Sequence, residues 1–398
     1  MEKIVKQLIA NDIEAALKNA SWIRKMFEAG AELKRERGAE NVFDFSLGNP
    51  DVPPPSKTRD VLHALADDAV RPCGLGYMPN AGLQDFREAL ALRLSAEQQC
   101  ALSGKHLVIT VGAAGAIVAF FRAILERGDE VIVPAPYFVE YGFYCGHFGG
   151  ILKPVPMQGP EFALNPEALL SAVTEKTRVI LLNSPNNPTG AIYTKDALGR
   201  LTEAVNTLNK TRSRPIFILS DEPYRLFAFE GATVPPILPL SPYAIVLGSF
   251  SKSLSLAGER IGYIAVNPAL EGVETLLAAV TMTIRTLGYV NAPILGQRLA
   301  MALLDEQIDL NIYEERRQAM AKVLTDAGLT FALPRGAFYF FPAAPGGDDV
   351  AFCAKLMAHG IIAVPGRGFG MPGYLRLCCA VERDIIERSA AAFKDACQ

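Results

Sequence analysis

The stretch AIVLGSFSKSLSLAGERIGYI, residues 244–264, decides the fold class, because an uncharged apolar run ends there in a polar loop that holds one lysine. Residues 244–248 have the composition of a buried strand in a parallel sheet. Lys252 is therefore expected just beyond the carboxyl end of a strand, where open α/β folds bind their ligands. A poorly solvated amine at such a place has a lowered pKa and can act as a Schiff-base nucleophile.

The hydroxyl groups and the arginine of the same loop suit an anion. Ser249 and Ser251 are spaced to flank a phosphate, and Arg260 can return to add a bidentate contact. Taken alone, the stretch is equally compatible with a polar loop that carries a surface lysine, since short motifs recur by chance. The rest of the chain has to decide between these two interpretations.

The composition is that of a globular protein with a large core. The chain has 398 residues, of which 50% are apolar and 20% charged, and this length allows two domains. The net charge of -3 argues against nucleic acid or an anionic membrane as the main partner. Seven cysteines without a C-x-x-C pair fit reduced thiols in a cytoplasmic protein, and four histidines without an H-E-x-x-H motif predict no metal site. The uncharged stretch 231–251 contains four prolines, so we expect a connection into a buried strand and not a membrane span.

Three segments near the N-terminus carry helix or loop signals. Residues 1–37 have apolar positions at helical spacing, which predicts an amphipathic helix or helix pair packed on the body or on a partner subunit. In FDFSLGNPDVPPP, residues 43–55, a turn that includes Gly48 leads into an extended crossing segment. GLGYMPNAGLQDFREAL, residues 74–90, is a glycine-rich loop entering a helix, and its Tyr77 either reaches a ligand or a partner, or simply packs.

A βαβ pattern begins at residue 107. Residues 107–138 read as a strand, a glycine-alanine turn, a helix capped by Gly128 and a second strand. The turn contains Ala113 and Ala114 and offers free N–H groups at a helix N-terminus, which suits a phosphate. It is not a dinucleotide fingerprint, because G-x-G-x-x-G is absent. Tyr137 follows the second strand and could offer a flat face on which a ring stacks.

After a helix start at residues 165–166, the strand pattern repeats twice before the lysine loop. One strand runs into a loop that contains Asn187, and the next ends at Asp221 and Tyr224. Because the carboxyl ends of parallel strands share one edge of a sheet, these side chains and Lys252 can converge on one crevice. A carboxylate there needs a cationic partner, although Asp221 could also be a helix cap or a turn acid.

Beyond residue 291 the pattern changes to long helices and a few short strands, which describes an α+β second domain. Arg376 lies among apolar neighbours in the last predicted strand. An arginine in such a place needs an anionic partner. That partner is either a structural carboxylate or the carboxylate of a ligand.

The order of these motifs resembles the class I/II pyridoxal-phosphate-dependent aminotransferases of fold type I, the aspartate aminotransferase-like enzymes. The resemblance runs from about Gly48 to Ala380. It implies an α/β fold in which a large domain with a mostly parallel seven-stranded sheet between helices is joined to a smaller α+β domain. The implied boundaries are an N-terminal segment joining the small domain at 1–50, a large cofactor-binding domain at 51–290 and a small C-terminal domain at 291–398.

The resemblance also implies roles for the convergent residues. Lys252 is similar to the lysine that forms a Schiff base with pyridoxal 5′-phosphate, and Asp221 to the carboxylate that pairs with the pyridinium nitrogen. Asn187 and Tyr224 match the donors to the ring 3′ oxygen, and Tyr137 looks like the residue that stacks on the ring. The implied catalytic residues are Lys252, Asp221 and Tyr224.

The phosphate and the substrate are assigned by the same resemblance. The implied phosphate ligands are the backbone amides of Ala113 and Ala114, the side chains of Ser249, Ser251 and Arg260, and Tyr77 from the other subunit of a homodimer. Many relatives carry a hydroxyl residue where this chain has residues 112–114, so the phosphate would depend more on backbone amides and on the 249–260 loop. Arg376 resembles the arginine that grips the substrate α-carboxylate, with Gly48 and Asn187 beside it.

The implied reaction moves the amino group of an α-amino acid to a 2-oxo acid through a Schiff base on Lys252. A β-eliminase or related lyase is the alternative, because the same cofactor site serves both reactions. A binding-only role is disfavoured by the presence of the base lysine. Arg285 looks loosely like a second arginine of dicarboxylate-specific relatives, after a one-residue shift, but a surface or structural role is the alternative. Acidic, aromatic and aliphatic amino acids therefore stay open as substrates.

Overall fold

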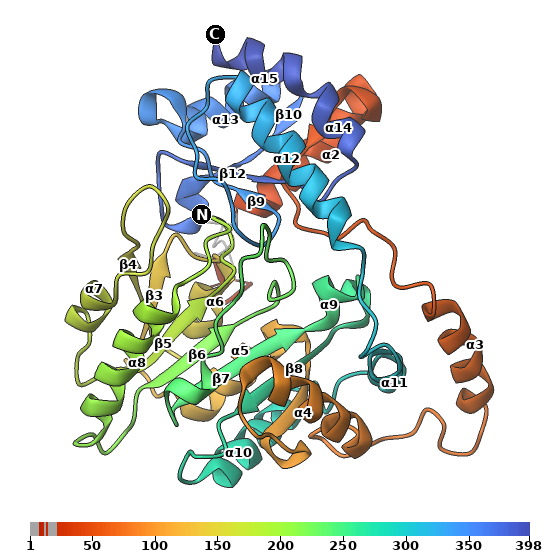
Figure 1. Cartoon of the computed structure of the whole chain (residues 1–398), viewed down its shortest axis with the longest axis vertical. Coiled ribbons are helices and arrows are strands. Elements are labelled where there is room, and N and C mark those ends of the chain that lie inside the picture. The colour runs from red at the N-terminus through yellow and green to blue at the C-terminus, as the bar shows by residue number, and fades with distance from the viewer. Residues whose placement is uncertain (1–7, 12, 15–21) are drawn as a thin grey trace, which may run out of the picture.

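The computed structural model describes residues 8–11, 13–14 and 22–398. The amphipathic pattern expected at 1–37 is therefore seen only in part. Its second half forms helix α2 (Trp22–Arg37), and residues 1–7, 12 and 15–21 lie outside the described residues. Figure 1 shows α2 beside the small C-terminal sheet, and the large sheet occupies the other half of the molecule.

A seven-stranded sheet forms the centre of the large half of the molecule, in the order β2-β8-β7-β6-β5-β3-β4. Only β8 runs antiparallel to its neighbours, and the remaining pairs are parallel. The expected mostly parallel sheet is thus confirmed. Its strands are β2 (Leu107–Val111), β3 (Glu130–Ala135), β4 (Ile151–Pro156), β5 (Thr177–Asn183), β6 (Phe217–Asp221), β7 (Ala244–Ser249) and β8 (Ile261–Val266).

Helices cover both faces of this sheet, which explains why its central strands are apolar on both sides. In β5, Val179 and Leu181 pack in the core shared with the helices at 112–124 and 273–286. Ile180 and Leu182 pack on the other face, in the core shared with the helices at 84–98 and 195–209. The helices of the large half are α3 (Thr58–Ala69), α4 (Gln84–Gln98), α5 (Gly112–Ile124), α6 (Glu140–Gly146), α7 (Pro166–Ser171), α8 (Lys195–Asn209), α9 (Phe250–Ser253), α10 (Val273–Thr286) and α11 (Ile294–Ala302).

The smaller half is built on short strands packed against helices (Figure 1). Strands β11 (Val364–Pro365), β12 (Leu375–Cys378) and β9 (Tyr339–Phe340) form an antiparallel sheet. Strand β1 (Phe43–Asp44) pairs with β10 (Ile361–Ile362), so the segment after α2 is joined to this half. Its helices are α12 (Leu310–Asp326), α13 (Asp349–Ala358), α14 (Arg383–Arg388) and α15 (Ala390–Cys397).

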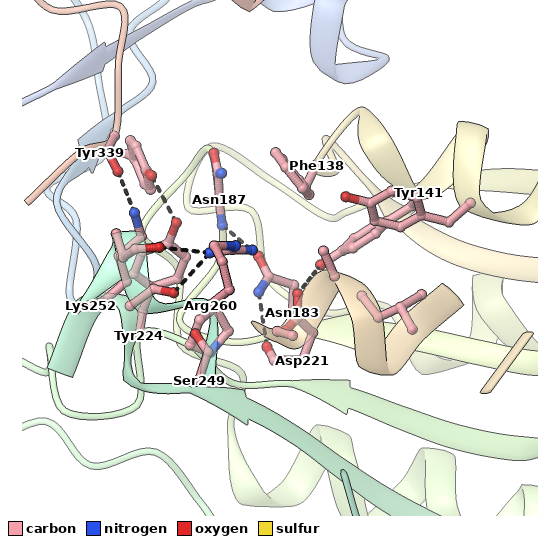
Figure 2. Close-up of a pocket in the computed structure, with 18 of the residues that line it drawn as sticks. Phe138, Tyr141, Asn183, Asn187, Asp221, Tyr224, Ser249, Lys252, Arg260 and Tyr339 are labelled. Carbon is pink, nitrogen blue, oxygen red and sulfur yellow. Dashed lines mark hydrogen bonds between the residues drawn. The ribbon is translucent and has the colours of Figure 1, made fainter. Parts of the chain in front are cut away.

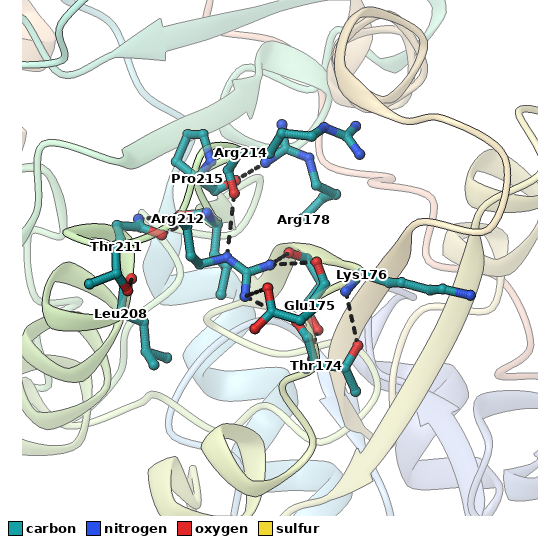
Figure 3. A network of polar contacts seen from close by, with 12 residues as sticks. Thr174, Glu175, Lys176, Arg178, Leu208, Thr211, Arg212, Arg214 and Pro215 are labelled. Atoms are coloured by element: carbon teal, nitrogen blue, oxygen red, sulfur yellow. Dashed lines mark hydrogen bonds and ion pairs between the residues drawn. The ribbon is translucent and has the colours of Figure 1, made fainter.

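An arginine network fixes the sheet at the edge opposite the strand carboxyl ends (Figure 3). Arg212 donates to the carbonyls of Thr174, Glu175 and Thr177, at 2.8 to 3.1 Å. These bonds tie the loop ahead of β6 to the loop ahead of β5. The two strands are thereby held in register, and their last residues, Asn183 and Asp221, pair at the other edge.

The βαβ unit differs from its expected outline in two details. Helix α5 begins at Gly112, so the glycine-alanine stretch is its first turn and not a separate loop. The helix ends at Ile124 with Leu125 as its cap, and Gly128 lies in the turn that follows. In contrast, the expected start of α7 is confirmed, because the Asn165 side chain accepts a hydrogen bond from Ala168 and Pro166 is the first helical residue. Across the described ranges, no helix combines the length and apolar character that crossing a membrane requires.

Candidate active site

A cavity of about 280 Å³ lies where the carboxyl ends of the parallel strands face the small C-terminal sheet (Figure 2). β6 and β7 end at Asp221 and Ser249, and α5 starts at the same edge. The sequence-predicted site residues that line the cavity are Gly48, Ala113, Ala114, Asn187, Asp221, Tyr224, Ser249, Ser251, Lys252, Arg260 and Arg376. Two expected residues, Tyr77 and Tyr137, are not among the lining residues.

Lys252 lies in the short helix α9 directly after β7, and its amine faces the cavity (Figure 2). Its Nζ donates a hydrogen bond to the carbonyl of Gly48. The pKa of this amine is lowered to about 8, chiefly by burial, with the positive charges of Arg376 and Arg260 acting in the same direction. Near physiological pH a far larger fraction of Lys252 is therefore neutral than of an ordinary lysine with a pKa of 10.5, and the neutral amine is the form that acts as a nucleophile or base.

Asp221 lies at the end of β6, where it is 5% exposed. Tyr141 donates a hydrogen bond of 2.5 Å to its Oδ2, whereas its Oδ1 has no hydrogen-bond partner. Burial raises the pKa of the carboxyl to about 7, against the lowering effect of the Tyr141 bond. Burying a carboxylate oxygen without a hydrogen bond costs free energy, so a ligand that donates a hydrogen bond to Oδ1 would be favoured here.

The opposite end of the cavity is built to hold an anion. Arg260 reaches across to Ser251, and its guanidinium lies 2.8 Å from where a Cβ on Gly112 would be. The backbone of Gly112 has φ +67°, which favours glycine, and opens the first turn of α5. The free N–H groups of that turn, the arginine and the serine hydroxyls together suit a phosphate group.

Arg376 is 2% exposed on β12 and faces the same cavity. It donates to the Oδ1 of Asn187 at 3.3 Å and to the carbonyl of Ser46, and its Nε has no partner. Its guanidinium is held between the rings of Tyr339 and Phe369, at 4.9 and 4.8 Å. Within the described residues no carboxylate pairs with it, so this buried cation is ready to receive an anion.

The family model of aminotransferase class I and II matches residues 40–393 of this chain. The chain belongs to this family. It is an aminotransferase, and class I and II aminotransferases use pyridoxal 5′-phosphate.

Known aminotransferases are similar to this chain in sequence and in structure along nearly its whole length. A probable aspartate/prephenate aminotransferase of Aquifex aeolicus is 32% identical over 387 residues, covering 92% of this chain and 94% of that protein. The aspartate aminotransferase of Bacillus subtilis is 32% identical over 380 residues, covering 89% and 91%. A crystal structure of an aminotransferase from Eubacterium rectale has a TM-score of 0.93 at 36% identity and covers 98% of both chains. The Thermus thermophilus aspartate aminotransferase with maleate has a TM-score of 0.86 at 27% identity, covering 98% and 100%.

The residues of this aminotransferase fit its family's cofactor. The unpartnered Oδ1 of Asp221 offers an acceptor to a protonated pyridine nitrogen, and Lys252 offers an amine to an aldehyde. The anion cradle at α5 and Arg260 fits the phosphate. The cavity thus offers a separate protein group to the ring nitrogen, the aldehyde and the phosphate of the cofactor.

The ring-stacking expectation for Tyr137 needs a correction. Its backbone N–H donates to the carbonyl of Phe369, and its ring lies against Gly370, where an added Cβ would come within 2.6 Å. The neighbouring side chain, Phe138, lines the cavity instead (Figure 2). The two adjacent side chains thus have different surroundings, so an error of one residue exchanges the packing residue for the lining residue.

Tyr77 and Arg285 lie away from the cavity of their own chain. Tyr77 is 94% exposed in the loop before α4. Arg285 is exposed near the end of α10. Neither residue can contribute to the described pocket unless a second chain brings it there.

Several lining residues were not among those expected. Asn183 is the last residue of β5, where it donates to the Asp221 carbonyl and accepts from the Asn187 N–H. The strand-end rule that selected Asp221 could have found it. Tyr141, Tyr144 and Tyr339 also line the cavity. A buried tyrosine usually only packs, so their sequence positions carried no signal.

Proposed function

We propose that this aminotransferase binds an α-amino acid through Arg376 and uses Lys252 as the base that takes the proton from its Cα. The observation that carries this proposal is the convergence of three ionisable groups that lack counterparts. Asp221 has an unpartnered oxygen, Arg376 has no carboxylate partner among the described residues, and Lys252 has a lowered pKa. A cofactor with a basic ring nitrogen and an aldehyde, together with an amino acid, satisfies all three.

Pyridoxal phosphate, when bound, supplies an aldehyde that condenses with amines and a ring that accepts the electron pair left on Cα. The protein supplies the charges that favour this chemistry. Asp221 holds a proton on the ring nitrogen, since it is buried and otherwise unpaired on one oxygen. Asn187 and Tyr224 hold the ring oxygen, and Phe138 replaces Tyr137 as the proposed stacking residue.

Lys252 is suited to the proton transfer because its pKa of about 8 lies close to the operating pH. Its Nζ takes the proton that leaves Cα and holds it within the cavity. The crossing segment is close, because the Gly48 carbonyl accepts a hydrogen bond from this amine. A base within reach of Cα and of the crossing segment can serve both halves of the amino-group transfer.

The anion cradle fixes the other end of the cofactor. We propose that the phosphate contacts the backbone N–H groups of Ala113 and Ala114 and the side chains of Ser249, Ser251 and Arg260. The start of α5 at Gly112 places its free N–H groups in the cavity wall, which supports this role. Arg376, with Gly48 and Asn187 beside it, is proposed to bind the substrate α-carboxylate in a bidentate contact.

We propose aspartate or an aromatic amino acid as the donor, in line with the relatives' names. Those names include aspartate, aspartate/prephenate and aromatic-amino-acid aminotransferases. The cations that line the described cavity are Lys252, Arg260 and Arg376, and each already has a role. A second substrate carboxylate would therefore need a cation from the partner subunit, for which Arg285 is a candidate because it is exposed.

We infer a homodimer in which Tyr77 of one chain completes the phosphate site of the other. Tyr77 is 94% exposed and Leu75 near it is 57% exposed, so both side chains are accessible to a second chain, which supports this arrangement. We also propose the division 1–50, 51–290 and 291–398, since β1 joins the N-terminal segment to the small half. Helix α11 falls after residue 290 but packs against α3, α4 and β8, so it is assigned to the large half. A cytoplasmic location is proposed because all seven cysteines are free thiols.

Spectroscopy of purified protein tests the proposal. Protein loaded with pyridoxal phosphate should be yellow, and its absorbance should shift when a donor amino acid is added. A panel of amino donors with 2-oxoglutarate or pyruvate then identifies the substrate pair. Release of pyruvate and ammonia without an oxo-acid acceptor would instead indicate a lyase, and no spectral response to any amino acid would refute the proposed reaction.

A further inference from the structure

Tyr339 enters the cavity from the small C-terminal sheet, on the same face as Arg376. β9 pairs antiparallel with β12, and the register sets Cys378 opposite Tyr339. Arg376 is two residues from Cys378 along β12, so its side chain leaves the same face of the sheet. The backbone arrangement therefore brings a tyrosine beside the arginine that is proposed to bind the substrate.

The Tyr339 hydroxyl is in direct contact with the hydroxyl of Tyr224, at 2.8 Å, and the two rings meet edge to face (Figure 2). The side chains are 2% and 6% exposed. Burial raises the pKa of both phenols, so both keep their protons at neutral pH. Each hydroxyl has one proton to donate. If Tyr339 donates to Tyr224, the Tyr224 proton is free for a further acceptor.

The Tyr339 side chain is also held by Arg376, which lies over its ring, and by Gly48, which lies next to its hydroxyl. Its ring lies under the Arg376 guanidinium, with 4.9 Å between Cζ and the ring centroid. Its hydroxyl occupies the space next to Gly48, where an added Cβ would come within 2.0 Å of it. These contacts leave little freedom for the phenol to turn away from Tyr224.

We propose that Tyr339 is a positioning residue, whose hydroxyl donates to Tyr224 and so directs the Tyr224 proton toward the ring oxygen of the cofactor. Its ring supports Arg376 from below. One side chain thus connects the cofactor end of the site with the substrate-carboxylate end. This inference rests on the function proposed above and adds a role that acts through Tyr224.

Several ionisable groups surround Tyr224 and Tyr339 and can influence how the site responds to pH. The titratable groups that face the two phenols are Tyr141 from α6, Asp221 from β6, Lys252 from α9, and Arg376 and Cys378 from β12. None of them is changed by removing a single hydroxyl. A shift seen on that change is therefore attributable to the lost hydrogen bond.

The test begins with Tyr339→Phe, which removes the hydroxyl and keeps the ring under Arg376. The Tyr224 hydrogen bond to the cofactor's ring oxygen favours the ionised form of that oxygen. If Tyr224 is held less firmly, this bond weakens, and the pH midpoint of the bound cofactor's absorbance should rise by about half a unit. The kcat should fall by about fivefold, as expected for one hydrogen bond. The KM of the amino acid and the inhibition constant of 3-phenylpropionate or succinate should stay within about twofold, because the cation–π contact remains.

Two further variants make the result specific. In a Tyr224→Phe background, Tyr339→Phe should change neither the midpoint nor kcat further, because its effect passes through the removed hydroxyl. Tyr313→Phe is the matched control, since Tyr313 is a buried tyrosine stacked on Phe338 whose hydroxyl has no hydrogen-bond partner. This control should leave the midpoint, kcat and KM unchanged. Thermal unfolding of each variant shows whether it is folded.

The outcomes separate this inference from the proposed function. Wild-type protein that binds no pyridoxal phosphate and transfers no amino group would refute the function itself. An active wild type with an unchanged midpoint and kcat in Tyr339→Phe would overturn the role of Tyr339 alone. Full and independent effects of the two substitutions in the double variant would overturn it too, since Tyr339 would then not act through Tyr224.

Discussion

Arg376 is the residue whose surroundings point most directly to a substrate. It is buried between Tyr339 and Phe369, and no carboxylate pairs with it in the described part of the chain. Replacing Arg376 with leucine should raise the KM of the amino acid on the order of 100-fold, because two charge-assisted hydrogen bonds to the α-carboxylate are lost. Steady-state kinetics measures this change, and cofactor absorbance should be retained.

A control for this prediction is Arg122→Leu, which removes an exposed arginine of α5. It should leave the KM unchanged. The assignment of Arg376 would fail if Arg376→Leu kept the wild-type KM, or if it lost the cofactor while the apparent affinity for the substrate stayed the same.

Asp221 gives a prediction for pH. Its pKa of about 7 in the folded protein, raised by burial, exceeds the ordinary value of 3.8. The folded state therefore keeps a proton that the unfolded chain loses between these values, and stability should fall as pH rises through this window. The slope for one group is at most about 1.4 kcal/mol per pH unit, and it should vanish above the folded pKa.

Urea unfolding of the cofactor-free protein between about pH 5 and pH 8 measures this slope. Asp221→Asn cannot titrate, so its unfolding free energy should fall less with pH than that of the wild type. Equal slopes in the two proteins would show that Asp221 is already ionised in the folded state without a cofactor.

At the scale of elements, the start of α5 is fixed by a close approach of two backbones. A Cβ on Gly262 of β8 would lie 2.4 Å from the carbonyl carbon of Gly112 and 2.7 Å from the nitrogen of Ala113. Gly262→Ala should therefore displace the first turn of α5 and weaken the binding of pyridoxal phosphate by at least about tenfold, because the phosphate loses its aligned N–H groups. Equilibrium dialysis of the cofactor measures this loss.

The matched control is Gly199→Ala in α8, where an added Cβ meets no atom within 4 Å. It should leave cofactor affinity unchanged and stabilise the helix by about 0.5–1 kcal/mol. Unaltered affinity in Gly262→Ala would mean that the phosphate does not depend on the amino end of α5.

The residues at the ends of the parallel strands could be predicted from the sequence, whereas those positioned by the backbone path or by strand pairing could not. Asn187, Asp221 and Lys252 were found because apolar runs mark the strands, and the carboxyl ends of parallel strands share one edge. The exchange of Tyr137 for Phe138 could not be foreseen, since it depends on the path of the backbone after β3. Tyr339 was missed for a related reason, because its role comes from the pairing of β9 with β12, far apart in the sequence.

At the scale of the whole molecule, the proposed dimer predicts that two inactive variants restore each other. Variant Tyr77→Ala lacks the proposed phosphate ligand from the partner, and variant Lys252→Ala lacks the base. In a mixed dimer, one site receives Lys252 from the first variant and Tyr77 from the second, so it is complete. Mixing the two after partial unfolding and refolding should give activity well above the sum of the separate variants.

The matched control mixes Lys252→Ala with Asp221→Asn, because these two residues belong to the same chain's site. In a mixed dimer of this pair, neither chain carries both wild-type residues, so neither site is complete and no activity should return. Equal recovery in both mixtures, or no recovery with Tyr77→Ala, would argue that Tyr77 does not cross the interface.

The most direct test of the account asks which amine holds the cofactor. Purified protein is incubated with pyridoxal phosphate, reduced with borohydride, digested and analysed by mass spectrometry. We predict one reduced pyridoxyl group, on Lys252, and none on that peptide when an amino acid is added before reduction. A stable adduct on another lysine, or an active protein with no adduct at Lys252, would contradict the proposed chemistry.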